Sequence, residues 1–184
     1  MALLPADPVK RGRLKLLALA GVFSLPVVLG WIAYLFDLVP GATGNYGELL
    51  APRPVEGAAL EALRGKWVLV VFDTPECDAY CERKLYFIRQ VRRAQGKDQL
   101  RVERAWVLTG TGVPRAELLA AIDDTQVLAP QGGRFLAQFP FAVSPADHVY
   151  VIDPRGYLMM RYPRDPDPSR MIRDLKRILR YARS

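Results

Sequence analysis

Residues 67–81 have the sequence WVLVVFDTPECDAYC, in which a buried strand leads directly into an amphipathic helix. Residues 67–72 are apolar on both faces and rich in valine, which is typical of a central strand that helices cover on both sides. From about residue 78 to residue 95, apolar residues recur at helical spacing among charged ones. The apolar residues of this stripe are Leu85, Ile88 and Val91. This stretch therefore predicts a strand followed at once by a helix.

Further elements are predicted on the C-terminal side of that helix. In chain order they are a strand at 102–108, a short helix at 114–122, a weak strand at 126–128, a helical turn at 134–138, a hairpin of 148–152 and 157–162 with its turn at 153–156, and a helix at 168–182. The first two strands should be parallel, with a right-handed crossover. A parallel strand-helix-strand unit followed by an antiparallel hairpin and a terminal helix is the element order of the thioredoxin fold. We therefore expect an α/β domain of thioredoxin-like class.

The chain has two cysteines, Cys77 and Cys81, and both lie where the first strand meets the helix. Open α/β sheets place their functional sites at such junctions. Cysteines four residues apart on a first helical turn face the same way, so their sulfur atoms can reach one ion or each other. The helix N-terminus favours thiolates, and two thiolates are soft ligands that select Cu(I) and tolerate zinc. The alternatives are a structural disulfide or two unrelated core thiols, and the flanking Glu76, Asp78 and Glu82 make core thiols the weaker of these.

His148 is the only histidine, and it stands where the hairpin begins. In a thioredoxin-like fold, the loop that enters this strand lies against the cysteine loop. A single histidine is more often a satisfied polar group than a ligand, but two sulfurs and one imidazole make a three-coordinate site for a soft metal. We therefore expect Cys77, Cys81 and His148 to bind a metal. If the protein is a reductase, Cys77 and Cys81 are its redox pair.

At these residues the chain resembles the Sco/SenC family of membrane-anchored, thioredoxin-like proteins, which are linked to assembly of the copper centre of cytochrome c oxidase. That family places a C-x-x-x-C pair after its first core strand. It also places an Asp-His pair before a strand that leads to a proline and a glycine turn. Cys77, Cys81, Asp147 and His148 match this pattern, together with the sequence VYVIDPRG at 149–156.

The resemblance covers residues 57–182 in element order, with two departures. Asp78 stands where the family has proline, and TGTGVP at 109–114 replaces an Asp-Pro-x-x-Asp-Thr stretch. The resemblance implies a diverged member that binds copper, as Cu(I) or Cu(II), and that has a cytochrome c oxidase subunit as its client protein.

Residues 16–36, LLALAGVFSLPVVLGWIAYLF, form an uncharged run long enough to cross a membrane. At helical rise such a run spans about 30 Å, which matches the hydrocarbon thickness of a bilayer. A buried core helix and a cleaved signal peptide are the alternatives, but the apolar region of a signal peptide is usually about 7 to 15 residues long. The run therefore predicts a single transmembrane helix that is retained.

The flanking charges predict the orientation of this helix. Four basic residues lie on its N-terminal side, whereas none lies between residue 37 and Arg53 on the other side. Residues 1–15 should therefore stay in the cytoplasm. We expect a bacterial inner-membrane protein with its C-terminal domain in the periplasm; in a mitochondrion the same orientation would place that domain in the intermembrane space. Residues 37–56, which contain several prolines and glycines, are expected to be a linker, and 57–184 the thioredoxin-like domain.

The formal net charge of +7 includes +3 from the first fifteen residues. The exported part is then only mildly basic, which gives no reason to expect nucleic acid as a partner. Met159 and Met160 are neighbours on one strand and point to opposite faces, so we interpret them as packing residues. The last helix carries a basic outer face made of Arg170, Arg173, Lys176, Arg177, Arg180 and Arg183. This face is either solvated or meets anionic lipid or an acidic partner.

Three functions are compatible with these features. A copper chaperone would use Cys77, Cys81 and His148 to bind copper and transfer it to an oxidase subunit. A thiol-disulfide reductase would use one cysteine to attack a client disulfide and the other to resolve the mixed disulfide. A non-catalytic scaffold would act only by docking on the oxidase. Three residues between the cysteines, together with the histidine, favour metal binding over the reductase.

Overall fold

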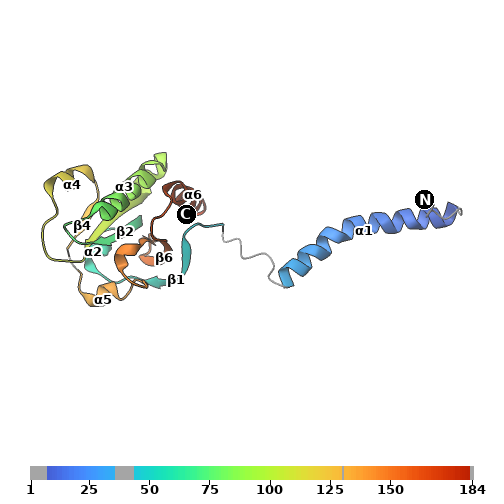
Figure 1. Ribbon diagram of the computed structural model, residues 1–184, viewed down its shortest axis with the longest axis horizontal. Coiled ribbons are helices and arrows are strands. Elements are labelled where there is room, and N and C mark those ends of the chain that lie inside the picture. Colours follow the sequence, from blue (N-terminus) through green and yellow to red (C-terminus); the bar gives the residue numbers. More distant parts are fainter. Residues whose placement is uncertain (1–7, 36–43, 130, 183–184) are drawn as a thin grey trace. The chain divides into compact units, whose positions relative to one another are not determined.

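The computed structural model describes residues 8–35, 44–129 and 131–182 and divides into two units, Met1–Thr43 and Gly44–Ser184. In the first unit, helix α1 extends over Pro8–Leu35 (Figure 1). Its segment Arg11–Ile32 is long and apolar enough to cross a membrane, and none of that segment is buried in the protein. This exposure argues against a core helix. Phe36, the last residue of the predicted span, lies outside the described residues, as do 1–7 and 37–43.

The second unit is built on one six-stranded sheet with the order β1-β6-β5-β2-β3-β4 (Figure 1). The strands are β1 Glu48–Pro54, β2 Trp67–Asp73, β3 Val102–Leu108, β4 Gln126–Leu128, β5 Val149–Ile152 and β6 Tyr157–Tyr162. β2, β3 and β4 run parallel, whereas the pairs β2–β5, β5–β6 and β1–β6 are antiparallel. The predicted parallel unit and the predicted hairpin are both confirmed.

Helices cover both faces of this sheet. They are α2 Ala58–Glu61, α3 Ala79–Arg93, α4 Ala116–Ala121, α5 Gly133–Leu136 and α6 Pro168–Tyr181, with the short 3-10 helices η1 Gly96–Arg101 and η2 Pro145–Asp147. Alternate residues of β2 enter two apolar cores, because successive side chains of a strand point to opposite faces. Leu69 and Val71 pack with residues of α3 and α6, whereas Val70 and Phe72 pack with residues of α2 and α5. The thioredoxin-like α/β fold is therefore confirmed.

Strand β1 lies inside the segment that was predicted to be a linker, residues 37–56. It forms the edge of the sheet, and most of its side chains are exposed. Such a strand lacks the alternation of buried and exposed residues by which strands are recognised in a sequence, and Pro52 is tolerated in it because edge strands accept proline. Just before β1, a Cβ atom at Gly47 would lie 2.6 Å from Sδ of Met160, so any other residue there would force the buried Met160 side chain to shift. The folded domain thus begins before residue 57.

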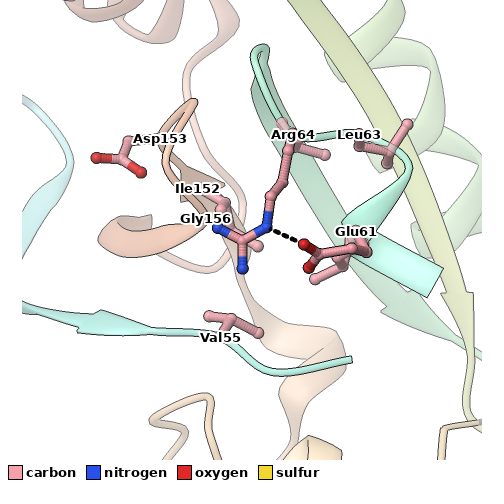
Figure 2. A pocket seen from close by; sticks show the side chains of 9 residues that line it. Val55, Glu61, Leu63, Arg64, Ile152, Asp153 and Gly156 are labelled. Carbon is pink, nitrogen blue, oxygen red and sulfur yellow. Dashed lines mark ion pairs between the residues drawn. The ribbon is translucent and has the colours of Figure 1, made fainter. Parts of the chain in front are cut away.

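The turn between β5 and β6 is fastened to the segment that follows α2 (Figure 2). Gly156 donates its N–H to the carbonyl of Asp153 at 2.9 Å and has a φ of 88°, which confirms the predicted tight turn. Arg64 donates to the carbonyl of Arg155 and pairs with Glu61 at 2.6 Å. Together these side chains border a small recess and hold the hairpin in place.

Candidate functional site

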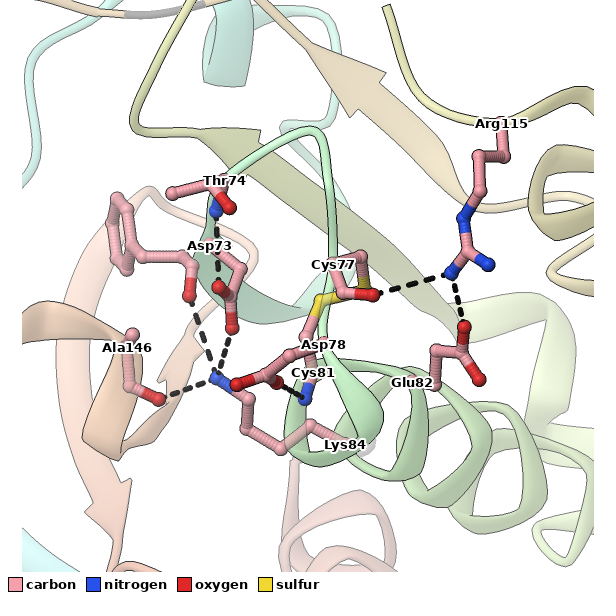
Figure 3. The surroundings of a disulfide bond; sticks show 10 residues. Asp73, Thr74, Cys77, Asp78, Cys81, Glu82, Lys84, Arg115 and Ala146 are labelled. Carbon is pink, nitrogen blue, oxygen red and sulfur yellow. Dashed lines mark hydrogen bonds and ion pairs between the residues drawn. A yellow bond between two sulfur atoms is a disulfide. The ribbon is translucent and has the colours of Figure 1, made fainter.

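A disulfide joins Cys77 to Cys81 at the junction of β2 and α3 (Figure 3). The two Cα atoms are 5.1 Å apart, and the side chains are 2% and 0% exposed. Cys81 lies in the first turn of α3, but Cys77 precedes the helix and has a left-handed φ of 46°. The expectation that both cysteines lie on the first helical turn is therefore wrong for Cys77. The pair forms because the loop turns Cys77 back over the start of the helix.

Asp78 is the N-cap of α3. Its side chain accepts a hydrogen bond from the backbone N–H of Cys81 at 2.9 Å. A capping carboxylate accepts a hydrogen bond from a free backbone N–H of the first turn, and its negative charge interacts favourably with the positive end of the helix dipole. The residue that departs from the Sco/SenC pattern thus holds the backbone of one cysteine.

Replacing Asp78 with alanine should lower the free energy of unfolding by about 1 kcal/mol, because the Cys81 amide loses its partner. Asp78→Ser is the matched control, since serine also caps helices and should retain most of the stability. The measurement is urea unfolding of the full chain in mild detergent, monitored by tryptophan fluorescence. Equal stability of Asp78→Ala and the wild-type chain would contradict a stabilising cap.

Arg115 brings a positive charge to the disulfide from the segment just before α4 (Figure 3). It donates to the carbonyl of Cys77 at 3.2 Å and forms an ion pair with Glu82. Glu76 is exposed, and hydrogen bonds from its own backbone N–H and from the Thr74 side chain lower its pKa. The acidic residues near the cysteines are therefore engaged in hydrogen bonds or an ion pair. The sequence offered no signal for Arg115, which lies 38 residues from Cys77.

Lys84 links the cysteine helix to the loop in front of β5. Its Nζ lies 2.8 Å from Oδ2 of Asp73 at the end of β2 and donates to the carbonyl of Ala146 in η2 (Figure 3). The side chain is 1% exposed, and this burial lowers the pKa of Lys84 although Asp73 opposes the shift. Through Lys84, the loop that enters β5 is therefore linked to Asp73 at the end of β2, where the cysteine loop begins. Sequence reasoning missed Lys84 because a lysine on an amphipathic helix is ordinarily solvent-exposed.

The His148 side chain contacts the two strands of the hairpin, β5 and β6. Its Nδ1 lies 2.9 Å from the carbonyl oxygen of Tyr162. Because a carbonyl oxygen only accepts, we assign the proton to Nδ1, which leaves the lone pair of Nε2 available. The ring packs edge-on against Tyr150, which belongs to the core on the α5 side, whereas Cys77 and Cys81 belong to the core on the α3 side. The structure joins Cys77 to Cys81 in a disulfide, and among the described residues it places His148 in no metal-holding group with them.

The donors fit a soft metal only after reduction of the disulfide. Across residues 8–35, 44–129 and 131–182, no group of three His, Cys, Asp or Glu side chains is placed to hold a metal ion. In the disulfide, neither sulfur is a thiolate, and the thiolate is the form that binds metals. Reduction would supply two adjacent soft donors, Cys77 and Cys81, which suit Cu(I). Met160 is fully buried in the core, in agreement with a packing role.

Comparison with known proteins supports the thioredoxin-like fold of the domain. Residues 67–182 match a family described as transmembrane-like, thioredoxin-like, C-terminal domain. No curated protein matches the sequence. Yeast Sco1 is 13% identical, with a TM-score of 0.53 over 77% of this chain and 99% of its own. Arabidopsis thaliana ScoI with copper bound is 13% identical, with a TM-score of 0.53 over 74% of this chain and 99% of its own. Yeast Sco1 with copper bound is 15% identical, with a TM-score of 0.52 over 74% and 93%. These likenesses establish a shared fold.

Proposed function

The chain belongs to the family of transmembrane-like, thioredoxin-like C-terminal domains, and from this we propose that it is a membrane-anchored copper-binding and thiol-redox protein that assists assembly of a cytochrome c oxidase copper centre. The observation that carries the proposal is the buried Cys77–Cys81 pair at the β2–α3 junction, which joins the loop before α3 to the first turn of that helix. The pair has two states with different chemistry. The disulfide stores oxidising equivalents, and the dithiol offers two soft ligands.

In the copper-binding state, Cys77 and Cys81 are reduced and His148 is the third ligand. The free Nε2 of His148 supports this role, and so does the position of η2 beside the end of β2. The fold shared with Arabidopsis ScoI and yeast Sco1, both solved with copper bound, supports copper as the metal. Copper is here a cargo, which the protein passes to an oxidase subunit as client.

The compartment is part of the same proposal. α1 is the anchor, residues 1–15 are cytoplasmic, and the thioredoxin-like domain lies on the periplasmic side of a bacterial inner membrane. The basic residues before the apolar run support this orientation. A periplasmic location also suits a disulfide, which persists in an oxidising compartment.

A thiol-disulfide reductase is the second candidate, favoured by the Cys77–Cys81 disulfide itself, which needs no histidine. In that reaction one thiolate attacks a client disulfide, and the second cysteine releases the client as the Cys77–Cys81 bond forms. The protein loses two electrons and two protons, and the client disulfide gains them as two thiols. This chemistry needs Cys77 and Cys81 but no histidine.

The redox state of the pair provides the test. The full chain in mild detergent, reduced and kept anaerobic, should bind about one Cu(I) per molecule, whereas the same protein with its disulfide intact should bind none at this site. A variant with Cys77→Ser and Cys81→Ser is the control and should match the oxidised protein. Reduction of a test disulfide is measured on the same samples. Copper uptake independent of the cysteines would contradict the proposed site, and absence of both activities would leave only a scaffold.

A further inference from the structure

Helix α6 presents a row of exposed basic side chains. We call Arg170, Arg173, Lys176, Arg177 and Arg180 the α6 basic face. Four of them share one side of the helix at the spacing i, i+3, i+4, i+7, and with Tyr181 they line a shallow hollow. In the described part of the chain, no carboxylate forms an ion pair with any of the five. No ion pair among the described residues therefore neutralises this face, although Arg170 lies over the Tyr46 ring at 4.1 Å from its centroid.

The neighbouring helix α3 differs in this respect. Its Arg83, Lys84, Arg89, Arg92 and Arg93 each lie within 3.8 Å of an aspartate carboxylate. Both helices pack on the same face of the sheet, so they offer a comparison within one domain (Figure 1). Carboxylates offset most of the positive charge of α3, whereas the α6 cations have no ion-pair partner among the described residues and keep a positive field that attracts anions.

The first described residues of the folded domain are hydrogen-bonded to α6. The carboxylate of the buried Asp174 accepts hydrogen bonds from the N–H groups of Tyr46 and Gly47 at 2.7 and 2.8 Å. Arg177 donates to the carbonyl of Gly44. These bonds fix the first described residues of the domain to the helix that carries the basic face.

The distance from α6 to the end of α1 is limited by the chain itself. Residues 36–43 separate Leu35, the last residue of α1, from Gly44. Even fully extended, a segment of this length reaches only about 30 Å. If α1 spans a membrane, Gly44, which Arg177 of α6 contacts, cannot lie farther than that from the end of α1, so the effective concentration of lipid headgroups at α6 is raised.

We propose that the α6 basic face docks on anionic lipid headgroups of the membrane that α1 spans. Lipid phosphate oxygens accept hydrogen bonds from guanidinium and ammonium groups. Tyr181 is 80% exposed beside the cations, and tyrosine is enriched at the headgroup level of membranes. The tether brings lipid to this face without a second protein, which favours lipid over an acidic protein partner. This inference rests on the membrane anchoring in the proposed function and is independent of copper.

The test uses the full chain in vesicles. Ser169→Cys, exposed in the first turn of α6, is labelled with a fluorophore while Cys77 and Cys81 are kept as their disulfide. Energy transfer to headgroup-labelled lipid then reports how close α6 lies to the bilayer. Transfer should be higher in vesicles with about 30% phosphatidylglycerol than in pure phosphatidylcholine, and about 0.5 M salt should remove the difference by screening.

Charge variants test the face itself. Because each cation near an anionic surface strengthens binding roughly fivefold, Arg173→Gln with Lys176→Gln and Arg180→Gln should lower the ratio of docked to undocked protein roughly 100-fold. The matched control removes the same charge from exposed positions outside α6, as Arg53→Gln with Arg134→Gln and Arg155→Gln, and should retain the transfer. Circular dichroism checks that both variants fold.

Two results would overturn the docking proposal. One is an equal loss of transfer in both triple variants. The other is no rise of transfer in anionic vesicles, which would leave an acidic protein as the partner. Flotation of the vesicles at high salt tests the anchor separately. Protein that fails to float would overturn the anchoring and the docking together, while the copper measurement in detergent would still judge the proposed metal site.

Discussion

Replacing Lys84 with methionine should lower the free energy of unfolding by about 3 kcal/mol. The side chain is 1% exposed and pairs with Asp73, which is itself 14% exposed, so its removal leaves a largely buried carboxylate without its partner. The carbonyl of Ala146 also loses its donor. The measurement is urea unfolding of the full chain in detergent, monitored by tryptophan fluorescence.

The matched control for Lys84→Met is Lys66→Met. Lys66 pairs with Glu103 at 2.6 Å, but its side chain is 45% exposed, and an exposed ion pair contributes about 1 kcal/mol or less. Adding Asp73→Asn to Lys84→Met should recover part of the loss, because the buried charge is then removed. Equal losses for Lys84→Met and Lys66→Met would show that the buried pair does not stabilise the site.

The pH dependence gives a second check on Lys84. Burial lowers its pKa below the ordinary value of 10.5. In the window between the lowered pKa and 10.5, the folded protein binds fewer protons than the unfolded chain, so stability from this group rises as the pH increases. The Lys84→Met variant should lack that rise. A difference in stability between the variant and the wild-type chain that is constant across this window would contradict the burial effect.

Replacing His148 with alanine should weaken Cu(I) binding by the reduced full chain about 100-fold or more. Losing the hydrogen-bond partner of a ligand costs roughly 10- to 100-fold in metal affinity, and losing the ligand itself should cost at least as much. Reduction of a test disulfide should change only modestly, because the reaction needs the two sulfurs alone. The measurement is competition for Cu(I) with a chelator of known affinity under anaerobic conditions.

Met159→Leu is the control for His148→Ala. Met159 is partly buried against the core and is interpreted as a packing residue, so its replacement should leave copper binding unchanged. Unchanged copper binding in His148→Ala would show that the Cys77, Cys81 and His148 site is wrong. Retained disulfide reduction in the same variant would then favour the reductase.

Local patterns in the sequence were sufficient for most of the fold. The apolar run 67–72 and the helical stripe of Leu85, Ile88 and Val91 correspond to β2 and α3. The Asp-Pro-Arg-Gly turn at 153–156 correctly predicted the hairpin. Each of these signals lies within a few residues, because strand period, helix period and turn chemistry are short-range properties.

The sequence by itself determined that an α/β sheet of thioredoxin-like class carries Cys77 and Cys81 at the end of its first core strand. Only the tertiary structure decided what surrounds them. Lys84 and Ala146 are 62 residues apart. β1 is held by β6, more than 100 residues away, although its exposed side chains show no alternation. The contacts of His148 come from the Tyr150 ring and from the carbonyl of Tyr162, which lies 14 residues away. Contacts of this kind depend on how distant segments pack, and no short-range pattern encodes them.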